Sequence, residues 1–210
     1  MFSKIVSAIF LVGLLAGCAV GNKVDYRAQS VSLNTGSQKA IALGVHDQRP
    51  YVLSGNKTPQ FVGIQRGGWG NPFDVLTQSG GPLAQDFATS ISSALTRSGA
   101  TVTAKAYPHS DSNDAVTKQL LALTADKYLL VSYQEWKTDS LMNTALIYDI
   151  TARVLLRDGT VVAQNHLSGR DKISGNVTGD QTRANDTVPA AVSRKLQLLL
   201  GDKEIIAALQ

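Results

Sequence analysis

The chain has 210 residues, of which 43% are hydrophobic and 17% charged, and its formal net charge at pH 7 is +4. This composition is typical of a globular protein and excludes an intrinsically disordered chain. The basic residues are scattered and form no long run, so the sequence gives no indication of nucleic-acid binding. The length suits one domain that can bury its own core.

An apolar segment from Ile5 to Leu15 stands near the N-terminus, directly after Lys4. It is shorter than the roughly 20 apolar residues that span a bilayer, and small residues follow it, as in a secretory signal peptide. Residues 15–18, Leu-Ala-Gly-Cys, resemble the bacterial lipobox. The resemblance implies that residues 1–17 are removed and that Cys18, the only cysteine of the chain, becomes the lipidated first residue.

The position after Cys18 indicates which membrane carries the anchor. In lipoproteins of bacteria with two membranes, an aspartate there tends to keep the protein at the inner membrane, and this chain has Ala19. The resemblance therefore implies the outer membrane, with the protein facing the periplasm. Residues 18–37 are polar with little periodicity, so we interpret them as a lipidated N-terminus and tether before a single α+β domain at residues 38–210.

Periodicity and turn residues predict the elements of this domain. The first half begins with a buried strand at 38–46 and an irregular glycine-rich segment at 51–81, which has short extended pieces at 61–65 and 73–77. A helix at 82–98, a strand at 101–106 and a helix from Ser112 or Asn113 follow. The second half has strands at 126–137, 144–157 and 160–172, a polar loop at 174–185, a helix from Asp186 or Thr187, and a short C-terminal helix. The order β-α-β-α-β-β-β-α predicts an α+β fold, with helices packed on one face of a mixed or antiparallel sheet.

Four features of the sequence are shared with one known group of proteins. They are the lipobox, a first strand that closes on Asp47-Gln48-Arg49, a helix that ends with Leu95-Thr96-Arg97-Ser98-Gly99, and the tail from Leu200 to Leu209. By these features the chain resembles the YajG-type bacterial envelope lipoproteins. Similar layouts occur in envelope lipoproteins that assist lipopolysaccharide assembly or lipid transport, and in the N-terminal domain of TolB-like proteins. The glycine-rich segment before the first helix departs from the YajG-type pattern.

The sequence offers no catalytic motif. His46, His109 and His166 are far apart, without the spacing of metal ligands and without a second cysteine, so we predict neither a metal nor a cofactor. No Gly-x-Ser-x-Gly motif indicates a nucleophilic serine. Paired carboxylates leave no signature in a sequence, so hydrolysis remains an open alternative. We expect a protein that is not an enzyme.

The segment Arg66-Gly-Gly-Trp-Gly-Asn-Pro-Phe73 is the strongest candidate for binding a partner. Arg66, Trp69 and Phe73 would supply charge and aromatic anchors on a flexible loop. The alternative is that Trp69 folds back and caps the sheet. Trp136 could be a similar anchor, although its position in a predicted strand favours packing in the core or at the sheet edge.

Asp47 and Arg49 form a second candidate, because they stand two positions apart at the end of the first strand. They are either a recognition point for a partner or a local ion pair that closes the strand. We therefore expect a non-enzymatic, membrane-anchored periplasmic lipoprotein that binds another envelope component, protein or glycolipid. The alternative is an accessory lipoprotein that handles lipid or lipopolysaccharide for an envelope transport or assembly machine, and a cell-wall enzyme comes third. A large apolar groove would favour lipid handling, and a flat aromatic patch would favour docking.

Overall fold

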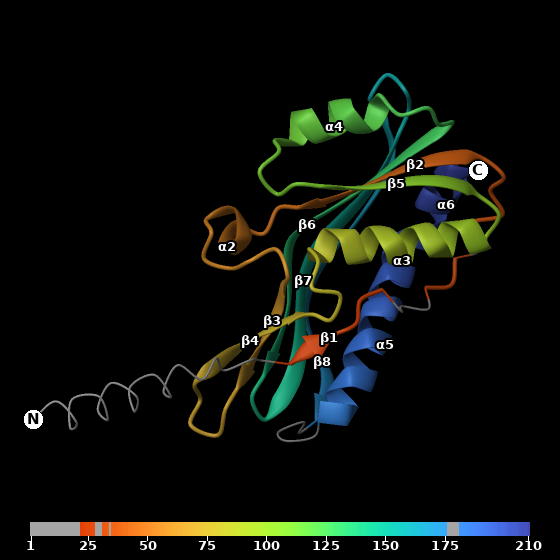
Figure 1. The fold of residues 1–210 in the computed structure, drawn as a ribbon. Helices are drawn as coiled ribbons and strands as arrows, with labels where there is room; N and C mark the ends of the chain where they lie inside the picture. The colour runs from red at the N-terminus through yellow and green to blue at the C-terminus, as the bar shows by residue number, and fades with distance from the viewer. Residues whose placement is uncertain (1–21, 28–30, 34, 176–180) are drawn as a thin grey trace, which may run out of the picture.

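The computed structural model describes residues 22–27, 31–33, 35–175 and 181–210, apart from the side chains of residues 174–186. In this part of the chain eight strands form one mixed sheet, on which helices pack (Figure 1). The strands are β1 (Lys23–Val24), β2 (Ala40–Asp47), β3 (Phe61–Arg66), β4 (Pro72–Thr77), β5 (Thr101–Tyr107), β6 (Lys127–Ser140), β7 (Asn143–Leu155) and β8 (Val161–Gly175). The helices are α2 (Pro50–Leu53), α3 (Leu83–Arg97), α4 (Asn113–Leu121), α5 (Gln181–Leu200) and α6 (Lys203–Leu209). The predicted α+β class is confirmed.

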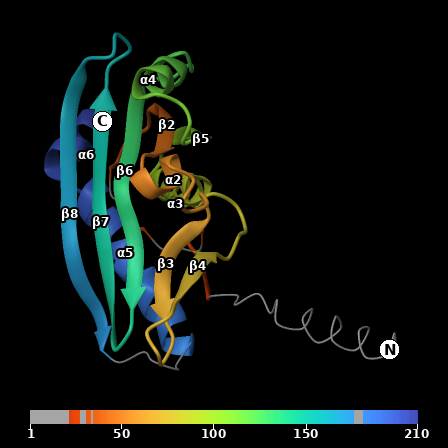
Figure 2. The ribbon, with the colours of Figure 1, turned by 90° about the vertical axis from the view of Figure 1, so that its left-hand side faces the viewer.

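Strand β6 is the centre of the sheet because it pairs along both edges. On one edge it pairs antiparallel with β7, which pairs in turn with β8. On the other edge it pairs in parallel first with β2, up to Asp47 opposite Tyr133, and then with β3, from Gly63 opposite Thr138. Strand β5 lies outside β2, and β4 and β1 lie outside β3. Figure 2 shows β6, β7 and β8 side by side, with β2 and then β3 along the edge of β6.

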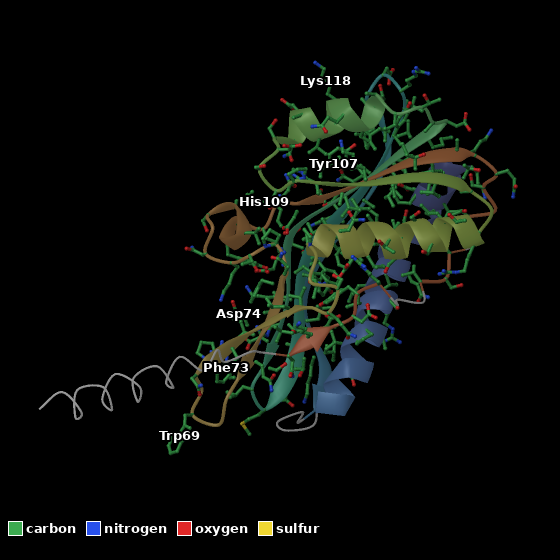
Figure 3. All side chains as sticks on the ribbon, in the orientation of Figure 1. Trp69, Phe73, Asp74, Tyr107, His109 and Lys118 are labelled. Carbon is green, nitrogen blue, oxygen red and sulfur yellow. The ribbon has the colours of Figure 1, made fainter. Side chains whose placement is uncertain are left out.

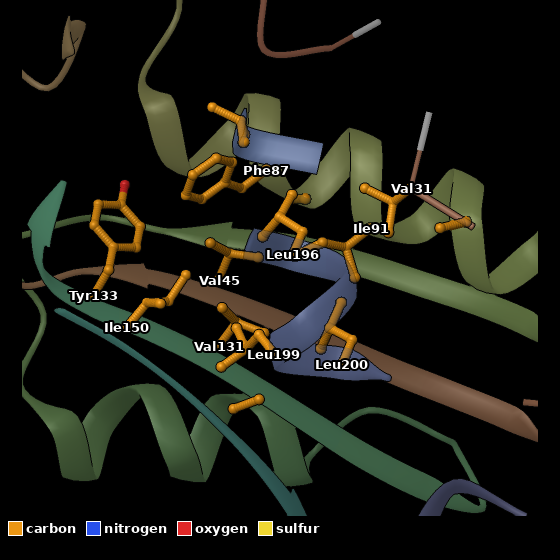
Figure 4. Close-up of a cluster of buried hydrophobic side chains, with 14 of the residues drawn as sticks. Val31, Val45, Phe87, Ile91, Val131, Tyr133, Ile150, Leu196, Leu199 and Leu200 are labelled. Atoms are coloured by element: carbon orange, nitrogen blue, oxygen red, sulfur yellow. The ribbon is translucent and has the colours of Figure 1, made fainter. Parts of the chain in front are cut away.

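The main core lies between the sheet and helices α3, α5 and α6. Helix α3 is amphipathic as predicted, and its Phe87 and Ile91 are fully buried. They share one hydrophobic cluster with Leu196 and Leu199 of α5 and with side chains of β2, β6 and β7 (Figure 4). The ring of Phe87 also meets Trp136 edge to face, with ring centroids 4.9 Å apart. Trp136 is therefore a core residue, as its place in a strand indicated.

Helix α4 packs on the opposite face of the sheet (Figure 1). Ser112 caps its N-terminus with its side chain, at the boundary that the sequence predicts. Val116 and Leu120 are buried against Ala42 and Tyr128 in a second, smaller cluster. Helices were predicted on one face only, and α4 is the exception. The reason is that β2 is apolar or small on both of its faces, so both need cover.

The first described residues belong to the domain and are not a tether. Strand β1 pairs with β4, and Val24, Tyr26 and Val31 are buried in the main core. For these residues the predicted tether is wrong. Their apolar side chains follow no period because most of this stretch is irregular, so periodicity could not detect them. No helix in the described ranges is long and apolar enough to cross a membrane.

Several element boundaries also differ from the prediction, and β6, for example, ends at Ser140 instead of residue 137. Strand β8 continues to Gly175, into the predicted polar loop, because its far end pairs with the start of β7. Helix α5 begins at Gln181, earlier than the predicted Asp186 or Thr187. For β8, pairing with a distant strand extends an element that the local pattern marks only weakly.

The two extended pieces predicted in the glycine-rich segment form the antiparallel hairpin β3–β4. Gly63 allows this hairpin to approach β6 closely. A Cβ atom at position 63 would lie 2.1 Å from Thr138 Oγ1 and 2.8 Å from the carbonyl oxygen of the same residue. Any larger side chain would therefore push β3 away from the sheet.

Candidate functional site

Two strand turns lie together at one end of the sheet, and we call the surface that they form the hairpin end. One is the β3–β4 turn at residues 67–71, and the other is the β6–β7 turn at Leu141 and Met142. The turns are neighbours because Gln65 of β3 pairs with Ser140 of β6. Figure 3 shows Trp69 at the tip of the β3–β4 turn, pointing away from the rest of the molecule.

The β3–β4 turn is closed by its own backbone. The amide of Gly67 donates to the carbonyl of Asn71 at 2.9 Å, and the amide of Gly70 donates to the carbonyl of Gly67 at 2.8 Å. Gly70 has a φ of 81°, a conformation that favours glycine. This turn holds Trp69 outward, where 99% of its surface is exposed. Of the two alternatives for Trp69, the outward position is observed. Phe73 is half-buried beside the turn.

A charged groove of about 460 Å³ lies beside the β6–β7 turn, and residues from the ends of β3, β6, β7 and β8 line it. Arg66 donates from Nε to Asp139 Oδ1 at 3.1 Å, and a guanidinium nitrogen of Arg170 lies 3.7 Å from Asp139 Oδ2. Lys172 lines the same groove. The lining of the groove thus contains three cationic side chains and one carboxylate, and the groove keeps a positive charge.

Large apolar side chains stand beside these charges. Met142 is 70% exposed and Leu141 is 43% exposed. With Trp69 they give the hairpin end three exposed apolar side chains from two turns. The sequence prediction found only the residues of the β3–β4 turn, because those of β6, β7 and β8 come to it through strand pairing. The sequence does contain one indication of the second turn, because Leu141 and Met142 are adjacent apolar residues between two predicted strands.

Asp47 and Arg49 are not on the surface. Arg49 is fully buried and Asp47 is 2% exposed. Arg49 donates from Nε to Asp47 Oδ1 at 2.9 Å and from Nη2 to Asp47 Oδ2 at 2.7 Å. Burial opposes the charge on Arg49, but the bonds to Asp47 outweigh it and raise the pKa of the guanidinium. The local ion pair is therefore observed, and neither side chain lies on the outer surface, while Asp47 lines the cavity described below.

The guanidinium of Arg49 also joins three strands. Its remaining N–H groups donate to the carbonyls of Pro59 at 3.2 Å, Phe61 at 2.5 Å and Trp136 at 3.2 Å. Trp136 lies in the interval of β6 after its last pair with β2 and before its first pair with β3. Arg49 thus donates to a backbone carbonyl of β6 in this interval, as the hydroxyl of Tyr51 also does, and to carbonyls of the segment that leads into and begins β3. Its role is to hold the hairpin β3–β4 to the sheet.

A separate apolar cavity of about 340 Å³ opens at the carboxyl ends of β2 and β5. Three prolines line it, Pro59, Pro82 and Pro108, together with Asp47 and with Tyr107 and His109, which Figure 3 labels. In α/β sheets such crevices are a common place for ligands. Sequence patterns could not predict this cavity, because its lining comes from four separate segments of the chain.

The three histidines do not form a site. His46 is buried, and burial lowers its pKa, which the nearby carboxylate of Asp47 only partly offsets. His166 lies 2.9 Å from Asp149 on the surface of β7 and β8. Within the ranges that the structure describes, no group of three or more histidine, cysteine, aspartate or glutamate side chains could hold a metal ion.

No protein-family model and no curated protein matches the sequence. Among solved structures, protein XCC0632 from Xanthomonas campestris, assigned to the family model DUF330, is 15% identical with a TM-score of 0.50, over 90% of this chain and 94% of that one. The PelC dodecamer from Paraburkholderia phytofirmans is 10% identical with a TM-score of 0.37, over 81% of this chain and 91% of that one. Lipoprotein GNA1162 from Neisseria meningitidis is 14% identical with a TM-score of 0.30, over 75% of this chain and 96% of that one. The similarity to XCC0632 shows a shared fold. The other two structures are less similar to this chain.

Proposed function

We propose that the protein is a non-enzymatic, lipid-anchored envelope lipoprotein of the YajG type, and that its domain binds another envelope component through the hairpin end. The observation that carries the proposal is Trp69, held outward and 99% exposed by a closed turn. Large aromatic side chains dominate the energetics of binding surfaces. Because the side chain of Trp69 is exposed, it does not stabilise the folded domain through burial. A role in binding would explain why the turn holds an aromatic side chain in water.

The anchor is the second part of the proposal. Cys18 and Ala19 lie outside the residues that the structure describes, and the support for lipidation is the lipobox-like segment of the sequence. Lipidation at Cys18 and the absence of an aspartate at position 19 favour the outer membrane, facing the periplasm. The variant Cys18→Ser should lose its fatty acid and leave the membrane fraction. A density gradient should place the unchanged protein with outer-membrane markers, and recovery with inner-membrane markers would contradict the proposed location.

A second candidate function is supported by the cavity at the ends of β2 and β5. Its lining of prolines, alanines and Tyr107 is mostly apolar, which favours an accessory that handles lipid or lipopolysaccharide. Mass spectrometry of lipids that copurify with the protein tests this candidate. A bound lipid in stoichiometric amount supports it, and a lipid-free preparation argues for the docking function alone.

Site-specific crosslinking in intact envelopes tests the docking function. A photoreactive amino acid replaces Trp69 in one variant and Leu156 in a matched control, since Leu156 is also exposed but lies at the opposite end of β7. We expect adducts with an envelope component at position 69 and none at position 156. Equal labelling at both positions, or none at position 69, would overturn the proposal.

A further inference from the structure

The direction of β1 shows from which side the chain enters the domain. Strand β1 is parallel to β4, with Lys23 opposite Leu76 and Val24 opposite Thr77. Strand β4 begins at Pro72, directly after the β3–β4 turn, and runs away from that turn. Because the two strands are parallel, the chain reaches Lys23 from the side of the hairpin end. The chain therefore enters from the side of the hairpin end, although β1 itself pairs with the far end of β4, at Leu76 and Thr77.

The length of chain before β1 limits how far the anchor can be. Five residue steps separate Cys18 from Lys23, and an extended chain covers at most about 3.3–3.6 Å per residue, or about 17 Å in all. Strand β6 alone has 14 residues and spans about 45 Å. A lipid on Cys18 would thus hold the hairpin end close to the bilayer, while the opposite end of the sheet stays far from it.

We propose that the hairpin end contacts the surface of the phospholipid bilayer that carries the anchor, with Trp69 at the level of the lipid headgroups. This inference rests on the proposed function, because it names the envelope component that the hairpin end binds. The proposed binding partner of the hairpin end is a lipid bilayer. The test below can instead show that the hairpin end binds a protein.

The chemistry of the hairpin end fits this occupant. Tryptophan is enriched at membrane interfaces, where its ring is in contact with lipid while its N–H remains hydrated. Met142 and Leu141 add exposed apolar surface on the neighbouring turn. The positive charge of the groove, from Arg66, Arg170 and Lys172 around a single carboxylate, complements anionic headgroups. Charge, apolar surface and the position of the chain entry therefore coincide at one end of the molecule.

The fluorescence of the two tryptophans offers a direct test. Trp69 is 99% exposed and Trp136 is fully buried, so only Trp69 should respond to quenchers outside the domain. The mature, lipidated protein is reconstituted into vesicles of phosphatidylethanolamine and phosphatidylglycerol, and part of the lipid carries bromine on its acyl chains. The variant Trp69→Phe, which keeps the buried tryptophan, is the matched control.

We expect bromolipids to quench the unchanged protein several-fold more than Trp69→Phe, and aqueous iodide to quench Trp69 several-fold less in vesicles than in the folded, unlipidated Cys18→Ser protein in solution. Replacing both Arg170 and Lys172 with glutamine should reduce the bromolipid quenching. A Trp69 that stays open to iodide in vesicles, with bromolipid quenching no greater than in Trp69→Phe, would overturn the inference.

The vesicles contain no other protein, so this test separates the inference from the proposed function. If Trp69 stays in water in vesicles but crosslinks to a protein in intact envelopes, the membrane contact is wrong and the docking function stands. If Trp69 is neither quenched by lipid nor crosslinked in envelopes, both are wrong.

Discussion

The substitution Arg49→Met tests whether this buried arginine fastens the β3–β4 hairpin to the sheet. Methionine keeps much of the side-chain length but removes the charge, which leaves the carboxylate of Asp47 buried without its partner. It also removes the donors to three backbone carbonyls. Breaking one side of a buried ion pair costs about 3–5 kcal/mol, a large part of the stability of an ordinary domain. For a chain of this size the melting temperature should fall by roughly 6–20 °C.

Urea unfolding followed by circular dichroism measures this loss. The matched control is Arg66→Met, since Arg66 also pairs with an aspartate but its side chain is 34% exposed. Exposed pairs contribute about 1 kcal/mol or less, so the control should unfold almost as the unchanged protein does. If Arg49→Met lost no more stability than Arg66→Met, the role of Arg49 in joining the strands would be refuted.

The remaining predictions concern stability, and urea unfolding measures each of them. Trp69→Ala should change the free energy of unfolding by less than about 0.5 kcal/mol, whereas Trp136→Ala should lower it by about 3–5 kcal/mol; equal effects would contradict the assignment of one as exposed and the other as core. Gly63→Ala should cost about 1–3 kcal/mol because its Cβ meets the backbone of β6, while Gly68→Ala, which faces open space, should be nearly neutral. Burial lowers the pKa of His46 in the folded chain below its ordinary value of 6.5, so below about pH 6.5 the unfolded chain binds a proton more readily than the folded chain does. The free energy of unfolding should therefore decrease as the pH falls below about 6.5. His46→Gln should make this decrease shallower, and an unchanged slope would exclude His46 as its source.

Local patterns in the sequence predicted much of the fold. Helix α3 was clear because its apolar residues repeat at the period of a helix and pack on one face. Strands β2, β5, β6, β7 and β8 were also found, since alternation and turn residues mark them. These elements depend on interactions between residues close in the chain, or on the burial of one face. Both leave a pattern of apolar and turn residues that can be recognised in the sequence.

Features built by distant residues escaped prediction. The buried Tyr26 belongs to a segment without periodicity, and its place in the core follows from the contacts of β1 with β4. The motif Asp47-Gln48-Arg49 was recognised, but the three carbonyls that Arg49 binds come from two other segments. The exposure of Trp69 could not be decided either, because an aromatic residue among glycines has no period that indicates a face.

The parallel pairing of β1 with β4 also determines how a pull on the N-terminus would reach the domain. The chain enters β1 from the side of the hairpin end, so a force that pulls the chain before Lys23 toward that side acts along the strand axis. The bonds between β1 and β4 are then strained together, in shear, instead of opening one after another as in peeling. Val24 and Tyr26 must leave the core before the segment can slide. A pull on the chain before Lys23 would therefore move the folded domain as one body and would not unravel it from β1.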